Sequence, residues 1–161
     1  MPQLHEKLKS RFPDAVLEIH DQHGNETAVV KREALLEIAR FVKEDPEFDM
    51  NMLSDLAAVD GLAQKWQPRF EVVYHFYSLA KNHRLRLKVR VDEKDCVVST
   101  LTGLWPAANW LEREVWDMFG VRFEGHPDLK RILMYEEFTG HPLRKDYPVA
   151  KRQPLVPPLK P

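Results

Sequence analysis

The densest group of side chains that could do chemistry is the run Glu112-Arg113-Glu114-Val115-Trp116-Asp117. Carboxylates beside an arginine can serve acid–base catalysis, because one can donate a proton that another accepts. On a helix, however, Glu112 and Glu114 lie about 200° apart and do not share a face. Arg113 and Asp117 can pair on the helix surface, which contributes only about 0.2–0.5 kcal/mol. The run therefore indicates a charged interface or a solvated face rather than a catalytic site.

A second group of charged residues follows one face of an expected strand. Residues 84–91 alternate strictly between basic and apolar side chains, which is typical of a strand with one buried face. The basic residues are Arg84, Arg86, Lys88 and Arg90. Three interpretations stay open: a solvated sheet face, a docking surface for an acidic partner, or a platform for single-stranded nucleic acid, which combines arginine with aromatic residues. The nearby aromatics Phe70, Tyr74 and Phe76 share one face of their own strand, which favours a core role for them.

Two histidines, His126 and His141, lie in similar phrases, each followed by proline and then by basic residues. As metal ligands they are poorly placed, because fifteen residues of extended chain span roughly 45 Å at about 3.1 Å each and no other ligand is near. We interpret them instead as parts of two turns in a segment that presents basic side chains. Proline restricts the backbone conformations of such a segment before it binds a partner, and this lowers the entropy cost of docking.

Other classes of function are disfavoured by what the sequence lacks. It contains no glycine-rich phosphate loop, HExxH motif or nucleophile elbow. Cys96 is the only cysteine, which excludes a disulfide within the chain and any iron–sulfur or zinc site built on several cysteines. A formal net charge of −1 argues against a general nucleic-acid or anionic-membrane binder. No apolar run is long enough to span a membrane, and residues 1–6 resemble no targeting segment, so we expect the protein to stay in the compartment where it is made.

The elements that must position these residues follow from the periodicity. Helices are expected near residues 4–12, 32–44 and 106–119, and strands near 15–19, 27–30, 52–59, 69–78, 84–91 and 97–101. Gly120 lies where a left-handed helix cap is expected. Helices and strands do not alternate regularly, so the fold class is α+β. We expect one mixed, largely antiparallel sheet with helices on one face, plus an extended C-terminal tail.

The C-terminal segment differs in character from the rest of the chain. From His126 onward its prolines interrupt every periodic pattern, and such a segment cannot offset its ordering entropy by internal burial. The prolines are Pro127, Pro142, Pro148, Pro154, Pro157, Pro158 and Pro161. We therefore expect a core domain over residues 1–133 and a partner-docking tail over 134–161. Truncation after Tyr135 is expected to leave the core folded.

The longest continuous pattern covers residues 104–133 and is called the signature here. It begins with Leu104-Trp105-Pro106-Ala107-Ala108-Asn109-Trp110-Leu111-Glu112-Arg113-Glu114 and continues through Asp117-Met118-Phe119-Gly120 to Gly125-His126-Pro127-Asp128-Leu129-Lys130-Arg131-Ile132-Leu133. It resembles the signature of the 30-kDa subunit of respiratory complex I, which in bacteria is the C subunit of the NADH:quinone oxidoreductase. Residues 140–148, 69–74 and 84–89 resemble the same family, so the likeness extends over about residues 52–148.

The resemblance implies that the chain is a subunit of an electron-transfer complex. The subunit itself is then expected to have no catalytic residue, metal or cofactor. Such a subunit lies in the peripheral arm, on the cytoplasmic side of the membrane. It packs against the 49-kDa subunit near the quinone-reducing site, and its tail runs along that partner. Flavin mononucleotide and iron–sulfur clusters are then expected in partner subunits. The implied partner interface comprises Glu112, Arg113, Glu114, Asp117, His126, Lys130, Arg131, His141, Arg144, Lys145, Asp146 and Tyr147, with Arg84, Arg86, Lys88 and Arg90 from the sheet.

Several alternatives stay open. The same family supplies subunits to membrane-bound hydrogenases, methanophenazine-linked dehydrogenases and the ferredoxin-fed photosynthetic enzyme. Outside the family, the alternatives are a nucleic-acid-binding α+β module and a metalloenzyme. The ending Gly140-His141-Pro142-Leu143-Arg144-Lys145-Asp146-Tyr147-Pro148 favours the bacterial NADH type.

Overall fold

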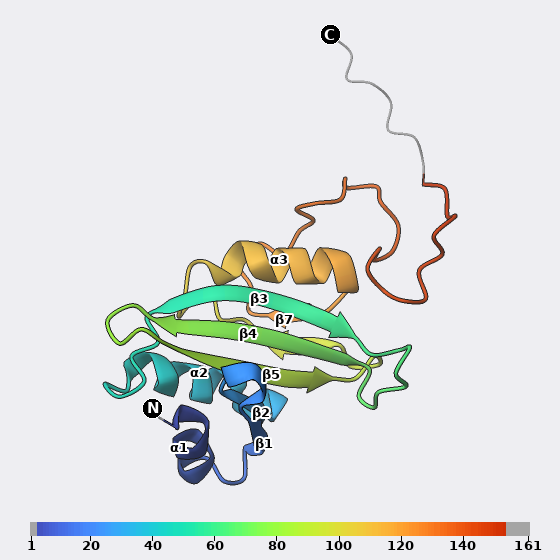
Figure 1. Cartoon of the computed structure of the whole chain (residues 1–161). Helices are drawn as coiled ribbons and strands as arrows, with labels where there is room; N and C mark the ends of the chain where they lie inside the picture. The colour runs from blue at the N-terminus through green and yellow to red at the C-terminus, as the bar shows by residue number, and fades with distance from the viewer. Residues whose placement is uncertain (1–2, 154–161) are drawn as a thin grey trace.

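The computed structural model describes residues 3–153 and shows an α+β arrangement of three helices around a twisted sheet (Figure 1). The elements in chain order are α1 (Leu4–Arg11), β1 (Val16–His20), the 3-10 turn η1 (Gln22–Gly24), β2 (Thr27–Val30), the 3-10 turn η2 (Arg32–Ala34), α2 (Leu35–Glu44), β3 (Met52–Asp60), β4 (Phe70–Ser78), β5 (His83–Val91), β6 (Val97–Ser99), α3 (Ala108–Phe119) and β7 (Arg122–Glu124). Every expected helix and strand is present, with ends shifted by at most three residues. The strand β7 is an element that the sequence did not predict.

The main sheet has five strands in the order β1-β2-β5-β4-β3. Three neighbouring pairs are antiparallel, and β2 pairs with β5 in parallel, so the expected mixed, largely antiparallel sheet is confirmed. The strand expected at 97–101 is shorter and lies outside this sheet, because β6 pairs in parallel with β7. The chain therefore has a second, two-stranded sheet next to α3.

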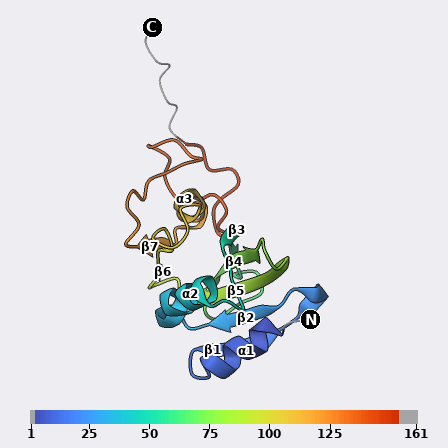
Figure 2. The same ribbon diagram turned by 90° about the vertical axis from the view of Figure 1, so that its left-hand side faces the viewer.

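One face of the main sheet forms the hydrophobic core. The alternation in β4 and β5 turns Phe70, Tyr74, Phe76 and the leucines of β5 inward, and the three aromatics are at most 1% exposed. The apolar face of α2 packs on this core, in which Ile38 is fully buried. Burial of such side chains contributes roughly 1.5–3 kcal/mol each. Figure 2 shows α2 and the β6–β7 pair on the same side of the sheet.

The opposite face of the main sheet, called the helix-free face here, carries the basic residues of β5. Antiparallel pairing sets His75 of β4 beside Arg86, and Tyr77 beside Arg84. Arg84 and Arg90 are exposed, while Arg86 and Lys88 are partly buried. These four basic residues, called the basic stripe here, therefore lie on the face away from the core, as the alternation of residues 84–91 predicts.

Helix α3 lies beside β3, and the segment after β7 loops around it, as the end-on view of α3 in Figure 2 shows. Gly120 adopts the expected left-handed conformation at the end of α3, with φ 80°. The residues expected to form the last part of the tail, 154–161 with Pro154, Pro157, Pro158 and Pro161, lie outside the described residues. Within residues 3–153, no helix combines the length and apolar character needed to cross a membrane.

Candidate functional site

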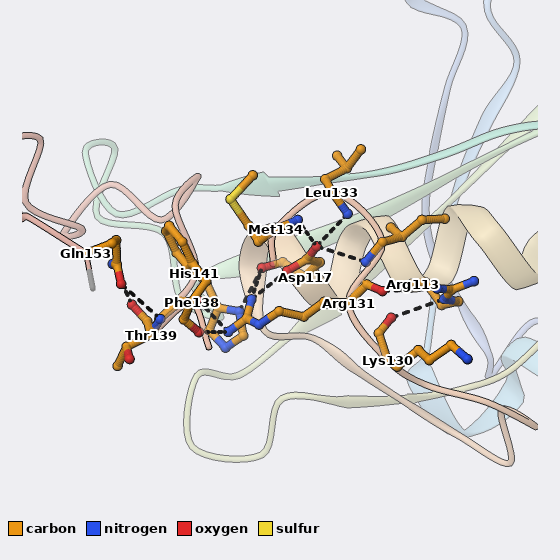
Figure 3. A network of polar contacts seen from close by, with 12 residues as sticks. Arg113, Asp117, Lys130, Arg131, Leu133, Met134, Phe138, Thr139, His141 and Gln153 are labelled. Atoms are coloured by element: carbon orange, nitrogen blue, oxygen red, sulfur yellow. Dashed lines mark hydrogen bonds and ion pairs between the residues drawn. The ribbon is translucent and has the colours of Figure 1, made fainter. Parts of the chain in front are cut away.

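A buried carboxylate on α3 organises the chain that follows β7 (Figure 3). Asp117 is 0% exposed, and its Oδ2 accepts hydrogen bonds from the backbone N–H groups of Ile132, Leu133 and Met134 at 3.1, 2.9 and 2.8 Å. Its Oδ1 accepts a charge-assisted bond of 2.5 Å from Arg131. Burial alone would raise the pKa of Asp117, but these donors outweigh it, and the pKa lies below its usual value.

The Arg131 side chain links Asp117 to a more distant part of the segment. Its NH2 group donates to the carbonyl oxygens of Phe138, at 2.7 Å, and Gly140, at 3.1 Å. The guanidinium also contacts two rings, 5.8 Å from the centroid of Trp116 and 5.5 Å from that of Phe138. One arginine therefore holds residues 131–140 against α3 through an ion pair, two hydrogen bonds and two cation–π contacts.

The partner of Arg113 differs from the one expected. Arg113 donates to the carbonyl oxygens of Lys130 and Arg131 at 3.1 and 3.0 Å, and Asp117 pairs with Arg131 instead. The expectation of a surface pair between Arg113 and Asp117 is wrong, because Asp117 faces the interior. Arg113 and Asp117 both bind the returning chain, through different partners.

The C-terminal end of α3 is closed by the same segment. Its last carbonyl groups lack partners within the helix. His141 Nδ1 lies 3.0 Å from the carbonyl oxygen of Asp117, and Arg144 Nε donates to that of Phe119 at 2.6 Å. A Cβ atom at Gly120 would lie 2.7 Å from both His141 and Arg144. We call Asp117, Arg131, His141 and Arg144 the α3 clasp.

A second anchor joins the segment to the end of the main sheet. Arg69 is 6% exposed and pairs with Asp60 through Nε–Oδ1 and NH2–Oδ2 contacts of 2.9 and 2.7 Å. Asp146 accepts two further bonds from Arg69, at 3.0 and 2.8 Å, and Glu93 accepts one at 2.6 Å. The backbone N–H of Lys145 donates to Asp60 at 2.8 Å. Burial opposes ionisation of Asp60, yet its hydrogen bonds lower its pKa to about 2.

Sequence reasoning did not name Asp60 or Arg69 as site residues. They flank the loop between β3 and β4, and Arg69 lies in the stretch 69–74 that resembles the family. Sequence reasoning did single out Asp146, Lys145 and Tyr147. The Tyr147 ring stacks on Phe138 with centroids 6.0 Å apart. Residues 134–153 thus contact the domain at several points, and the division between residues 133 and 134 stays a prediction.

Glu112 lies in a separate, buried environment. Its side chain is 0% exposed and accepts bonds from Thr100 Oγ1 at 2.6 Å and from Leu101 N–H at 2.7 Å. Burial outweighs these donors and raises the pKa of Glu112 to about 7. Glu114 is exposed, as expected for two residues on different helix faces. Because Glu112 and Asp117 are fully enclosed within this chain, their assignment to direct partner contact is corrected to internal roles.

His126 holds the turn that follows β7. His126 Nε2 lies 3.0 Å from the carbonyl oxygen of Asn109, and its Nδ1 accepts the N–H of Asp128 at 3.0 Å. Lys130 is exposed and pairs with Asp128 at 2.8 Å. Among residues 3–153, His, Cys, Asp and Glu side chains form no group of three or more that could hold a metal ion.

The basic stripe on β5 lies apart from this site. No hydrogen bond or ion pair between described residues joins Arg84, Arg86, Lys88 or Arg90 to the α3 clasp. Lys88 pairs with Glu71 at 2.8 Å, and Arg90 pairs with Glu18 at 2.8 Å. The residues named from the sequence therefore form two sets. One lies along α3 and the segment after β7, including the anchor at Arg69, and the other lies on the helix-free face.

The signature residues that fold the segment around α3 coincide with a family pattern. Residues 28–153 match the family described as the 30-kDa subunit of respiratory-chain NADH dehydrogenase. The chain belongs to this family. A relative from Geobacter sulfurreducens, named as the C subunit of NADH-quinone oxidoreductase, is 48% identical over 143 residues, which cover 89% of this chain and 86% of the relative. A Roseiflexus protein of the same name is 48% identical over 148 residues, which cover 92% of this chain and 84% of that protein.

Two solved structures share the fold of this chain. A trypsin-resistant fragment of Nqo5, residues 1–134, superposes with a TM-score of 0.68 at 36% identity, over 80% of this chain and 100% of the fragment. A chain from the membrane-bound sulfane sulfur reductase, an archaeal respiratory membrane complex, gives a TM-score of 0.70 at 24% identity, over 92% of this chain and 85% of that one. The second likeness shows a shared fold alone. The expected family and fold class are confirmed.

Proposed function

We propose that this chain is a subunit of the peripheral arm of a proton-translocating NADH:quinone oxidoreductase and has no catalytic residue of its own. It packs against the 49-kDa subunit next to the quinone-reducing site, on the cytoplasmic side of the membrane. The observation that carries this proposal is the family match over residues 28–153, together with relatives 48% identical that are named as the C subunit of this enzyme.

The geometry around α3 supports a non-catalytic role. The carboxylates of Glu112 and Asp117, which could have served acid–base chemistry, are enclosed and bonded within the chain. Burial raises the pKa of Cys96 to about 11, so its thiol stays protonated at neutral pH and is a poor nucleophile and metal ligand. We therefore propose that flavin mononucleotide and the iron–sulfur clusters reside in partner subunits.

Exposed apolar side chains around α3 support docking to a partner. Trp110 on α3 is 70% exposed, and Leu133, Leu143 and Val149 on the segment after β7 are at least half exposed. Large apolar side chains of this kind form the buried centre of protein interfaces. In the proposal, the α3 clasp shapes this surface, which is covered by the 49-kDa subunit.

Affinity purification from membranes tests the proposal. A tagged full-length chain should recover the 49-kDa subunit and NADH-dependent quinone reductase activity. Recovery of a nickel-binding hydrogenase large subunit, or of ferredoxin-dependent activity alone, would contradict the NADH type. The purified chain by itself should be colourless, and stoichiometric iron, zinc or flavin in it would contradict the cofactor-free role.

A further inference from the structure

The helix-free face carries a cleft whose charges are only partly neutralised. Strand register aligns Asp55 of β3, His75 of β4 and Arg86 of β5 in one row across the sheet. Directly opposite residues of this kind lie about 4.5–5.5 Å apart. The cleft has a volume of about 180 Å³ and is bounded by this row, by Arg84 and by the residues just before β2. Its size suits a small charged group rather than a large ligand.

Arg84 and Arg86 differ from the other two basic residues of β5. Lys88 and Arg90 each have a carboxylate at 2.8 Å, whereas no carboxylate of residues 3–153 lies within ion-pair distance of Arg84 or Arg86. The Nε group of Arg86 is buried and has no hydrogen-bond partner among the described residues. A buried donor without a partner is unfavourable, and an arginine fork is best satisfied by a carboxylate.

The acidic residues at the cleft do not satisfy these arginines. Glu26 points toward α1, where its Oε2 accepts from the backbone N–H of His5 at 3.2 Å and lies 2.9 Å from His5 Nδ1. Asp55 Oδ1 accepts the N–H of Leu56 at 2.9 Å. Burial, and then the neighbouring Arg86, lower the pKa of His75 below its usual value and so disfavour a charge on its ring. The positive charge of the cleft therefore comes from its two arginines.

We propose that the cleft at Arg84 and Arg86 receives an aspartate or glutamate side chain of a partner protein in the same assembly. This rests on the proposed function, which supplies the assembly, and it narrows the docking role from the whole stripe to one half of it. The incoming carboxylate pairs with the two guanidinium groups. Lys88 and Arg90 stay paired with Glu71 and Glu18 and contribute little to docking.

A substitution at Asp55 provides a second test, because it should strengthen docking where loss of the arginines weakens it. Asp55 is exposed and lines the cleft, where its carboxylate repels an incoming anion. Asp55→Asn removes this repulsion, and the amide oxygen can still accept the N–H of Leu56. The proposal therefore requires that loss of an acidic residue strengthens docking while loss of two basic residues weakens it.

A competition experiment measures both effects on the intact chain. Wild-type and variant full-length chains, with different tags, are expressed together, and their ratio in the purified membrane complex is divided by their ratio in the cell. Arg84→Gln/Arg86→Gln should be incorporated about tenfold less than wild type, as expected for loss of a desolvated charge pair. Asp55→Asn should be incorporated more than wild type. Arg90→Gln is the matched control and should equal wild type.

Each outcome is decisive. Equal incorporation of Arg84→Gln/Arg86→Gln and wild type would overturn the proposal, as would weaker incorporation of Asp55→Asn in a chain with an unchanged unfolding midpoint. If the isolated chain binds a single-stranded oligonucleotide, and the double variant abolishes that binding but not incorporation, the cleft is a nucleic-acid site and the proposal is wrong. If the wild-type chain itself is absent from the complex, the proposed function fails instead.

Discussion

The carboxylate of Asp117 and the guanidinium of Arg131 meet inside the chain, with Oδ1 2.5 Å from NH1. Both belong to the signature that the sequence alone assigns to a partner surface. Their pairing means that part of the signature acts within the chain itself, where it folds residues 131–144 against α3. Partner recognition then depends on the shape that this pair holds.

Asp117→Asn should destabilise the isolated chain by about 3 kcal/mol, because it leaves Arg131 without its counter-ion in a mostly buried site. The amide NH2 must also face either the Arg131 guanidinium or the backbone N–H groups of residues 132–134, and both of these are donors that need an acceptor. Glu114→Gln on the exposed face of the same helix is the matched control and should change stability by less than about 0.5 kcal/mol. Urea unfolding measures both, and equal midpoints for the two variants would contradict the internal role of Asp117.

Glu112 should make stability depend on pH. Its pKa is raised from 4.5 to about 7 in the folded chain, so the folded state holds a proton that the unfolded state has released. Its contribution is therefore fully present below about pH 4.5 and is lost as the pH rises through 7. The loss amounts to about 3 kcal/mol. Between about pH 5 and 8, the free energy of unfolding of wild type should fall relative to that of Glu112→Gln as the pH rises. Parallel curves for the two proteins would refute the assignment.

Gly120→Ala should lower stability by at least about 1–2 kcal/mol, because an alanine is strained at φ 80°. Its Cβ would also displace His141 and Arg144. Gly103→Ala is the control, since a Cβ there has no heavy atom within 4 Å. Thermal unfolding distinguishes the two, and the Gly120 variant should in addition bind its partner more weakly. An unchanged midpoint for Gly120→Ala would argue against the close contact.

Truncation after Tyr135 tests where the autonomous domain ends. The sequence predicts little change in the unfolding midpoint. The contacts of Arg131 with residues 138 and 140, and of Arg69 with Asp146, lead us to expect a decrease of roughly 5 °C with the domain still folded. Loss of the folded state in the shorter chain would show that the tail belongs to the core.

Much of the fold could be predicted because it rests on periodic burial. The alternation in β5 places Leu85 and Leu87 in the core and Arg86 on the other face, and the predicted cap at Gly120 is present. The partners of the charged residues could not be predicted. Arg69 and Asp146 are 77 residues apart, and contacts between loops follow no period.

The sequence did contain an indication that Glu112 is buried, although its charge suggests exposure. It lies four residues after Ala108 and three before Val115, both buried, so it shares the apolar stripe of α3. A charged residue inside an apolar stripe indicates a buried, bonded group rather than a solvated one. The density of charged residues around Glu112 led instead to the prediction that it lies at the partner interface.

The parallel pairing of β2 with β5 has a consequence for synthesis of the chain on the ribosome. Thr27 pairs beside Arg86, so the β1–β2 hairpin cannot join the sheet until about sixty further residues have been made. Until then Ala28 and Val30 lack their neighbours on β5, Leu87 and Val89, and contacts between such distant residues form slowly. The nascent chain therefore exposes an apolar hairpin early. Completion of β5 gives the hairpin its place in the sheet, and the signature, whose Trp105 and Val115 belong to the same core cluster, completes the burial afterwards.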